Sequence, residues 1–318
     1  MPARTVIGQA SYTDRFSSSM ALIMTMLLGS VAMAVVTPEA QAQAEDFDHH
    51  AIVGLETLNN GRDLGGYVTA DGQYQVKFGK LLRTAKLADA SDNDIALLAS
   101  MGVQKVIDLR MLPERLSKPD KKIPGAQSYN ISTQTIPNIF VITGEDWLTM
   151  LRSIKTGVMD TYMAGMYRQL ISDPMAIRGT QKFFKEVLSA KGAVLWHCTS
   201  GKDRTGIEAY LLLCALGVSE DVARAEYLNT NYFMAEKAQA NYDKAYKITH
   251  SKWIASEFYK YEGVSEGWLD IALNVVARYG GVDAYLRNVI GLTDADFAQL
   301  QDMYLEPAAA VAAVAPAA

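Results

Sequence analysis

The pattern of apolar and polar residues predicts strands and helices along most of the chain. Residues 194–196 form an apolar run, and residues 103–109 are rich in β-branched side chains, so both predict buried strands. Ser91, followed by Asp94 and by apolar residues at helical spacing, predicts a capped helix that ends at Gly102. A helix therefore leads directly into the strand at 103–109.

Further helices are predicted where apolar residues recur every three or four positions. These segments are residues 181–190, residues 207–216, a helix capped by Ser219 that runs to about Leu228, and a last helix that begins at Thr293 and Asp296. Because strands and helices alternate, we expect one α/β domain with a mostly parallel central sheet flanked by helices.

Two stretches add helices to this plan. Residues 116–173 contain Trp147, several methionines and a helix-like run at 160–170, and residues 227–262 are rich in Tyr, Lys and Met. We expect both stretches to be helical insertions. Either their aromatic and methionine side chains only complete the core, or the insertions form a mobile lid that excludes water and selects a substrate.

Both ends of the chain are predicted to lie outside the domain, which we place at residues 45–306. Arg4 and Arg15 precede an apolar run at 21–36, and residues 40–44 have the small-residue pattern of a signal peptide cleaved after Ala44. We therefore expect an exported protein, periplasmic or secreted, with no stable membrane insertion after cleavage. Residues 307–318, almost only Ala, Val and Pro, are expected to form a flexible tail.

Charge and composition narrow the classes of partner. The 318 residues carry a net charge of −5 and no basic block, so nucleic acid is not an expected partner. The chain has four histidines and no cluster of metal ligands, and we expect no metal and no cofactor. Much of the chain between Cys198 and Cys214 is helical, which keeps the two sulfurs apart. We read Cys214 as a core residue and Cys198 as a free, reactive thiol.

The most informative segment is the loop between the strand at 194–196 and the helix at 207–216. A strand, a Gly-containing loop and a helix N-terminus form an anion site, because backbone N–H groups turn inward and the helix dipole adds positive charge. Arg204 can hold two oxygens of a phosphate, and the same field lowers the pKa of the Cys198 thiol. The pattern predicts a cysteine-dependent phosphatase. The alternative is a buried, inert cysteine beside a surface arginine.

Four segments together resemble the tyrosine phosphatases, in particular a bacterial branch of secreted tyrosine and phosphoinositide phosphatases. Residues 197–205, His-Cys-Thr-Ser-Gly-Lys-Asp-Arg-Thr, resemble the active-site loop. Residues 59–66 resemble an N-terminal signature, and residues 78–85 the segment after it, with Thr84 where Ser is usual. Residues 106–110, with Glu114 behind them, resemble a strand end that reads Asp-Leu-Arg. The resemblance spans about residues 54–305, is weakest over 116–173, and implies the three-layer fold of tyrosine phosphatases.

The resemblance implies a role for each residue of the loop. Cys198 attacks phosphorus and forms a phosphocysteine, while Arg204 and the loop amides stabilise the equatorial oxygens. Thr205 donates a hydrogen bond to the thiolate, and His197 orients the loop. The expected phosphate-binding residues are Thr199, Ser200, Gly201, Lys202, Thr205 and Gly206.

The general acid is predicted to be Asp203, because the resembling branch has an Asp there and no Trp-Pro-Asp segment occurs in the chain. Asp203 must then be protonated before it donates, which a nearby phosphate dianion favours. Asp173, before Pro174, is the alternative acid. Otherwise Asp203 is a carboxylate paired with Lys202 or Arg62.

The expected substrates are phosphorylated proteins and phosphoinositides. Lys202 adds a second positive charge, which suits a lipid headgroup with several phosphates. The supporting residues Arg62, Asp63, Asp108 and Arg110 are expected to hold the loop or to touch the substrate. Two other interpretations stay open: a phosphatase for inositol polyphosphates, and a pseudoenzyme that binds phosphorylated ligands without turnover.

Overall fold

The computed structural model describes residues 50–135 and 147–308. The main sheet of this described part has the strand order β1-β3-β6-β4-β5. β1 (Arg62–Asp63) is antiparallel to β3 (Leu81–Thr84). The rest of the sheet is parallel, with β6 (Ala193–His197), β4 (Val103–Asp108) and β5 (Gln127–Asn130). The predicted α/β fold with a mostly parallel central sheet is therefore confirmed.

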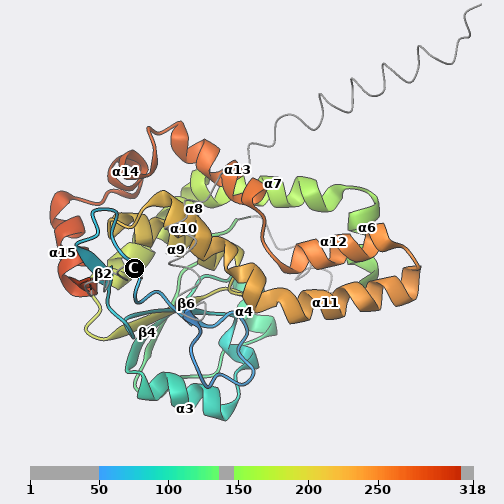
Figure 1. Cartoon of the computed structure of the whole chain (residues 1–318), viewed down its shortest axis with the longest axis horizontal. Helices are drawn as coiled ribbons and strands as arrows, with labels where there is room; N and C mark the ends of the chain where they lie inside the picture. Colours follow the sequence, from blue (N-terminus) through green and yellow to red (C-terminus); the bar gives the residue numbers. More distant parts are fainter. Residues whose placement is uncertain (1–49, 136–146, 309–318) are drawn as a thin grey trace, which may run out of the picture. The chain divides into compact units, whose positions relative to one another are not determined.

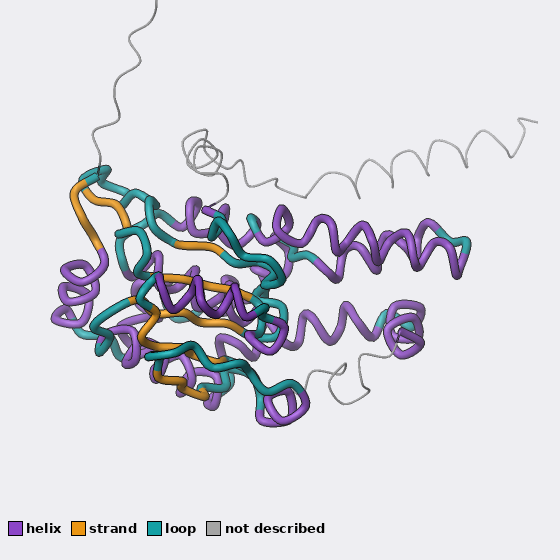
Figure 2. Tube along the Cα trace, turned by 90° about the horizontal axis from the view of Figure 1, so that it is seen from below, coloured by secondary structure: helices purple, strands orange, loops and turns teal. Residues whose placement is uncertain are grey.

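Helices cover both faces of this sheet. α3 (Asp92–Ser100) lies against one face, and α8 (Pro174–Leu188) and α9 (Asp203–Ala215) lie on the other (Figure 1; Figure 2 looks onto the α3 side). A 3-10 turn spans Leu87–Asp89 and a π-helical turn spans Leu286–Ile290. The remaining helices are α4 (Leu112–Ser117), α6 (Trp147–Lys155), α7 (Val158–Ser172), α10 (Glu220–Leu228), α11 (Thr230–Thr249), α12 (Lys252–Glu262), α13 (Glu266–Ala277), α14 (Val282–Tyr285) and α15 (Asp294–Tyr304).

β6 is buried along its whole length and packs on both of its faces. Leu195 belongs to a cluster with Leu98 of α3 on one side. On the other side the ring of Trp196 meets Phe183 of α8, with 5.6 Å between ring centroids. The Trp196 indole N–H also donates to the carbonyl oxygen of Thr205, at 3.1 Å. Because alternate side chains of a strand point to opposite faces, this packing fixes the strand that precedes Cys198.

The helix starts that the sequence predicts by capping are confirmed. Ser91 accepts from the Asp94 amide and Asp94 accepts from the Ser91 amide, a complete capping box for α3. The side chains of Ser219 and Thr293 accept hydrogen bonds at the starts of α10 and α15. These caps satisfy amides that have no partner inside the helix.

Two helices begin earlier than the apolar pattern predicts. The segment at 181–190 is the second half of α8, which begins at Pro174 because Asp173 accepts from the Met175 amide at 2.8 Å and proline fits the first helical position. The segment at 207–216 is part of α9, which begins at Asp203. Arg204 therefore lies in the first turn of a helix, not in the loop.

The stretches expected as insertions pack against each other. Residues 116–173 contain β5 and then α6 and α7, and residues 227–262 contain α11 and α12. Asp160 of α7 accepts from the hydroxyl of Tyr261, at 2.7 Å, and from Lys260, at 2.8 Å, both in α12. In Figure 1 these helices lie together beside the sheet.

The C-terminal end of the described part forms a second, two-stranded sheet. β2 (Tyr74–Val76) pairs antiparallel with β7 (Leu305–Pro307), and the Ala308 amide donates to the Gln73 carbonyl at 3.0 Å. Pro307, assigned above to the tail, is thus part of a strand. The predicted signal segment, residues 1–44, and residues 309–318 lie outside the described residues. Among the described helices, none has the length and apolar character needed to cross a membrane.

The register of the parallel strands brings their carboxyl ends together. His197 at the end of β6 is opposite Thr84 of β3 and Asp108 of β4. The segments that follow these three strands therefore begin at one edge of the sheet. Ligands of open α/β sheets bind outside this edge.

Candidate active site

The loop 198–202 connects β6 to the N-terminus of α9. Gly201 has a φ of +66°, and a Cβ at this position would lie 2.3 Å from the carbonyl oxygen of Thr84. Only glycine satisfies both constraints. Within the described part of the chain, the backbone amides of Thr199, Ser200 and Gly201 donate no hydrogen bond. These amides and the start of α9 offer an anion the donors and the positive helix dipole that it needs.

Cys198 is buried at the base of this loop, with 2% of its surface exposed. Burial raises the pKa of its thiol, but the charge of Arg204 and hydrogen bonds from Thr205 outweigh burial. The net effect lowers the pKa of Cys198 below its ordinary value, although Asp203 opposes this shift. The site therefore favours the thiolate, which is the nucleophilic form.

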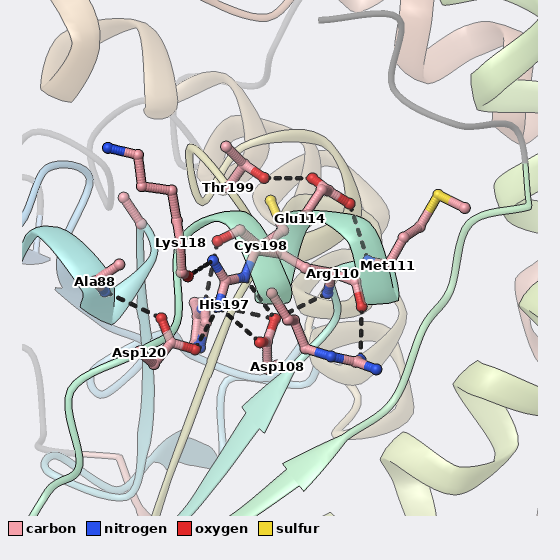
Figure 3. Close-up of polar contacts among 12 residues, drawn as sticks. Ala88, Asp108, Arg110, Met111, Glu114, Lys118, Asp120, His197, Cys198 and Thr199 are labelled. Atoms are coloured by element: carbon pink, nitrogen blue, oxygen red, sulfur yellow. Dashed lines mark hydrogen bonds and ion pairs between the residues drawn. The ribbon is translucent and has the colours of Figure 1, made fainter. Parts of the chain in front are cut away.

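Arg204 is held by Glu114, a residue of α4, which is the helix that follows β4 in the chain. The two terminal nitrogens of Arg204 donate to the two carboxylate oxygens of Glu114, each at 2.7 Å. Thr199 also donates to Glu114, at 2.5 Å, as Figure 3 shows beside Cys198. Burial raises the pKa of Glu114, but the hydrogen bonds and charge of Arg204 lower it to about 2. Glu114 is thus ionised at neutral pH and orients the guanidinium in fork geometry.

A buried group of three charged residues braces the loop from the opposite side. Glu226 of α10 accepts from Arg62 at 2.7 Å and from Arg83 at 2.8 Å. Arg83 also donates to the Gly201 carbonyl at 2.6 Å, and Asn60, itself bound by Arg62, donates to the same carbonyl at 2.8 Å. All three charged side chains are fully buried. Arg62 therefore supports the loop through Asn60 and Glu226.

His197 belongs to a second polar network below the loop (Figure 3). Its Nδ1 lies 3.0 Å from the Cys198 carbonyl oxygen, and its Nε2 lies 3.3 Å from Asp120. Burial lowers the pKa of His197, but the carboxylates of Asp120 and Asp108 raise it above its ordinary value overall. Arg110 binds both carboxylates, at 2.9 Å to Asp108 and 2.6 Å to Asp120. His197, Asp108 and Arg110 thus fix the backbone where β6 enters the loop.

The same network is the place where the described residues could hold a metal ion. Asp108, Asp120 and His197 have ligand atoms within 4.8 Å of one another. A metal ion there would compete with the guanidinium of Arg110, which already satisfies both carboxylates. Two of the three candidate ligands are thus already paired with an internal cation.

Lys202 and Asp203 point toward the helices beside the sheet. The Lys202 ammonium donates to the carbonyl oxygens of Tyr261, at 2.5 Å, and Gly263, at 3.0 Å. Asp203 accepts a hydrogen bond of 2.6 Å from the hydroxyl of Tyr167 in α7. Among the ion pairs of the described residues, Asp203 pairs with neither Lys202 nor Arg62.

The two remaining carboxylates predicted for the site make local contacts elsewhere. Asp63 accepts from the amides of Gly65, at 2.8 Å, and Gly79, at 2.5 Å, and so shapes the turns on either side of β2. Asp173 caps α8. Burial raises the pKa of Asp173, but hydrogen bonds, among them the one from the Met175 amide, lower it overall. A lowered pKa disfavours Asp173 as a general acid, because the acid must carry a proton.

The other predicted loop residues serve the packing of the loop. The Ser200 carbonyl accepts from Asn60 at 3.3 Å. Thr205 is fully buried and helps to lower the pKa of the Cys198 thiol. A Cβ at Gly206 would lie 2.9 Å from the ring of Tyr227, so a glycine there lets α9 approach α10.

Sequence reasoning missed several residues that hold this site. Glu114 and Arg83 lie inside recognised motifs, but neither was assigned a contact with the loop. Glu226 and Tyr167 have no local signal, because their partners lie 143 and 36 residues away in sequence. Such contacts depend on the tertiary fold.

A sequence model described as "Tyrosine phosphatase family" matches residues 53–306. A protein of Cupriavidus necator named "Putative tyrosine-protein phosphatase" is 30% identical over 278 residues, which cover 87% of this chain and 96% of the relative. A "Tyrosine-protein phosphatase" of Nostoc commune is 28% identical, over 69% of this chain and 72% of its own length.

A more distant relative carries a more specific name. The "Triple specificity protein phosphatase PtpB" of Mycobacterium tuberculosis is 25% identical over 276 residues. These residues cover 77% of this chain and 96% of the relative. All three similarities therefore extend well beyond the cysteine loop.

Proposed function

The chain belongs to the tyrosine phosphatase family, and we propose that it hydrolyses phosphotyrosine and phosphoinositide monoesters through a phosphocysteine intermediate. One observation carries the proposal: the buried Cys198, with its lowered pKa, lies at the base of a loop whose Arg204 is pre-oriented by Glu114. The proposed nucleophile and the proposed bidentate phosphate ligand thus lie at the two ends of one loop, Cys198 at its start and Arg204 in the helix turn that follows it.

In the first step the Cys198 thiolate attacks phosphorus and forms a P–S bond while the P–O bond to the leaving group breaks. Arg204 and the amides of residues 199–201 stabilise the equatorial oxygens, where negative charge is concentrated. Asp203 supplies the proton that the leaving oxygen needs. Protonation at this oxygen avoids the release of an unstable alkoxide or phenoxide.

In the second step water attacks the phosphocysteine and the P–S bond breaks. Asp203, now ionised, accepts a proton from the water, and the cysteine leaves as a thiolate. Thr205 and Arg204, which lower the pKa of Cys198, stabilise this leaving group. One carboxyl group thus serves as acid and then as base.

The N–H donors of the Lys202 side chain support the proposal that phosphoinositides are substrates. An ammonium has three N–H donors, and two of them are used by the carbonyls of Tyr261 and Gly263. The third donor is available to a second phosphate group. The described insertions, α6–α7 and α11–α12, are proposed to form a lid over this side, and residues 1–44 are proposed to direct export.

The test is phosphate release from a phosphotyrosine peptide, a phosphoserine peptide, phosphatidylinositol phosphates and inositol hexakisphosphate, with Cys198→Ser as the matched control. We expect release from the phosphotyrosine peptide and the lipids, unaffected by a chelator and lost in Cys198→Ser. Preference for inositol hexakisphosphate would favour the inositol polyphosphate interpretation. Binding without turnover on every substrate would overturn the proposal in favour of a pseudoenzyme.

A further inference from the structure

A chain of two hydrogen bonds connects the interior to Asp203. The hydroxyl of Tyr167 donates to one carboxylate oxygen of Asp203 at 2.6 Å, and it lies 2.6 Å from the hydroxyl of Tyr227. A tyrosine hydroxyl has a single proton. Since Tyr167 gives that proton to Asp203, Tyr227 must be the donor to Tyr167. The direction of both hydrogen bonds is therefore fixed, toward Asp203.

The Tyr167 hydroxyl is held rigidly in place. Tyr167 and Tyr227 are both fully buried. The Tyr167 ring stacks on Trp268 of α13, with 6.2 Å between centroids, and meets the Tyr227 ring edge-on at 6.5 Å. Tyr227 in turn rests against Gly206, the fourth residue of α9. Contacts with residues of α10 and α13 thus restrain the position of the Tyr167 hydroxyl.

Asp203 itself occupies the position where an acid would act. It is the first residue of α9 and precedes Arg204, the residue proposed to bind the phosphate. Its side chain is half-buried. The oxygen bound by Tyr167 is its Oδ1, and the other oxygen is then the one that can carry a proton. Holding one oxygen fixes the direction of the other, and proton transfer depends strongly on that geometry.

We propose that Tyr167 is a positioning residue that aims the Asp203 carboxyl group at the leaving oxygen of the substrate. This inference rests on the role of Asp203 in the proposed function. In the step concerned, the proton on Asp203 moves to the leaving oxygen as the P–O bond breaks, and Tyr167 keeps its own proton. Because Tyr167 lies in α7, that helix must be docked on α9 before the acid is aligned. The segment expected as a lid thus becomes part of the catalytic arrangement.

The test compares two substrates that differ in how much their leaving group needs a proton. Phenyl phosphate releases a poor leaving group, whereas nitrophenyl phosphate releases one that departs without protonation. We expect Tyr167→Phe to lower kcat/KM about tenfold on phenyl phosphate, a part of the ~100-fold or larger effect of a general acid, and to leave kcat/KM on nitrophenyl phosphate nearly unchanged. The quantity compared is kcat/KM because it reports the steps up to cleavage of the P–O bond and excludes the second step, in which Asp203 acts as a base for both substrates. Tyr227→Phe should give a smaller effect with the same substrate dependence.

Two control variants make the outcome decisive. Tyr304→Phe removes another buried hydroxyl, which donates to the Val187 carbonyl at 2.7 Å, and should show no dependence on the leaving group. Asp203→Asn should show the same dependence as Tyr167→Phe, and more strongly; if it shows none, the proposed acid is wrong. If Asp203→Asn shows the dependence and neither tyrosine variant does, Tyr167 does not position the acid. Equal losses of activity on both substrates in a folded Tyr167→Phe protein would likewise overturn the inference. If Tyr167→Phe does not fold, the substrate dependence of Tyr227→Phe decides the test.

Discussion

Arg204 and Glu114 form a bidentate pair in which each carboxylate oxygen accepts a hydrogen bond of 2.7 Å. Both side chains are almost fully buried, so water does not screen the pair. Glu114 is itself fixed, because it also accepts from the Met111 amide at 2.9 Å. The plane of the guanidinium is therefore set before a phosphate arrives. Such preorganisation reduces the rearrangement needed in the transition state.

Replacing Glu114 with Gln keeps the shape of the side chain but removes its charge. We expect a loss in kcat/KM of about tenfold to a hundredfold, because Arg204 loses its orientation, and a loss in the free energy of unfolding of about 3 kcal/mol from a buried unpaired charge. Steady-state kinetics and urea unfolding measure both. Glu186→Gln, which breaks the partly exposed pair with Lys105, is the control and should change neither strongly. Wild-type kinetics in Glu114→Gln would show that the pair is not needed.

The lowered pKa of Cys198 predicts alkylation at unusually low pH. Iodoacetamide should label Cys198 with a pH midpoint below that of a free thiol, since Arg204 and Thr205 stabilise the thiolate. Cys214 is an internal control, because burial raises the pKa of its thiol and it should react only at higher pH. Thr205→Ala should move the Cys198 midpoint upward. A midpoint equal to that of a free thiol would contradict the electrostatic account.

The buried carboxyl group of Glu208 should make the free energy of unfolding depend on pH. This effect is separate from catalysis. This residue of α9 is buried, accepts from Thr180 at 2.8 Å, and has its pKa raised by burial to about 8. A carboxyl with a raised pKa contributes stability that is fully present below its unfolded pKa of 4.5 and is lost as the pH rises through about 8. Glu208→Gln should remove this loss.

Urea unfolding at several pH values checks the Glu208 prediction. The advantage of Glu208→Gln over the wild type should grow by about 1.4 kcal/mol per pH unit between the two pKa values and then level off. A constant difference between the two proteins across this range would mean that Glu208 does not titrate as the structure indicates.

Lys202→Ala should separate the two substrate classes. If the third donor of its ammonium binds a second phosphate, the variant loses more activity on phosphatidylinositol bisphosphate than on a phosphotyrosine peptide, by about tenfold for one charged hydrogen bond. The ratio of the two kcat/KM values is the measurement. Equal losses would indicate that Lys202 only anchors the loop to Tyr261 and Gly263.

Local signals in the sequence predict the fold well. The caps at Ser91, Ser219 and Thr293 and the strand predicted at 103–109 depend on residues close in sequence. The structure confirms the caps and places the strand at Val103–Asp108. Cys198 and Arg204 could be proposed for the same reason, because they lie close together in the sequence.

The supporting contacts could not be predicted in that way. Glu226 forms ion pairs with Arg62 and Arg83 only once α10 has packed in the folded domain. Tyr167 reaches Asp203 only because α7 docks against α9. The side chains of Lys202 and Asp203 also point toward these helices, a direction that spacing along the chain does not specify. The sequence therefore suggests the chemistry of the loop, whereas the structure shows what holds the loop in place.

The most direct test of the account is detection of a phosphorylated Cys198 during turnover. The protein would be mixed with a phosphotyrosine peptide, quenched within the first turnover and digested, and the peptide that contains Cys198 would be weighed by mass spectrometry. We predict that this peptide gains the mass of one phosphoryl group on the cysteine, and that Cys198→Ser shows neither the adduct nor turnover. Turnover that persists in Cys198→Ser would contradict the proposed mechanism.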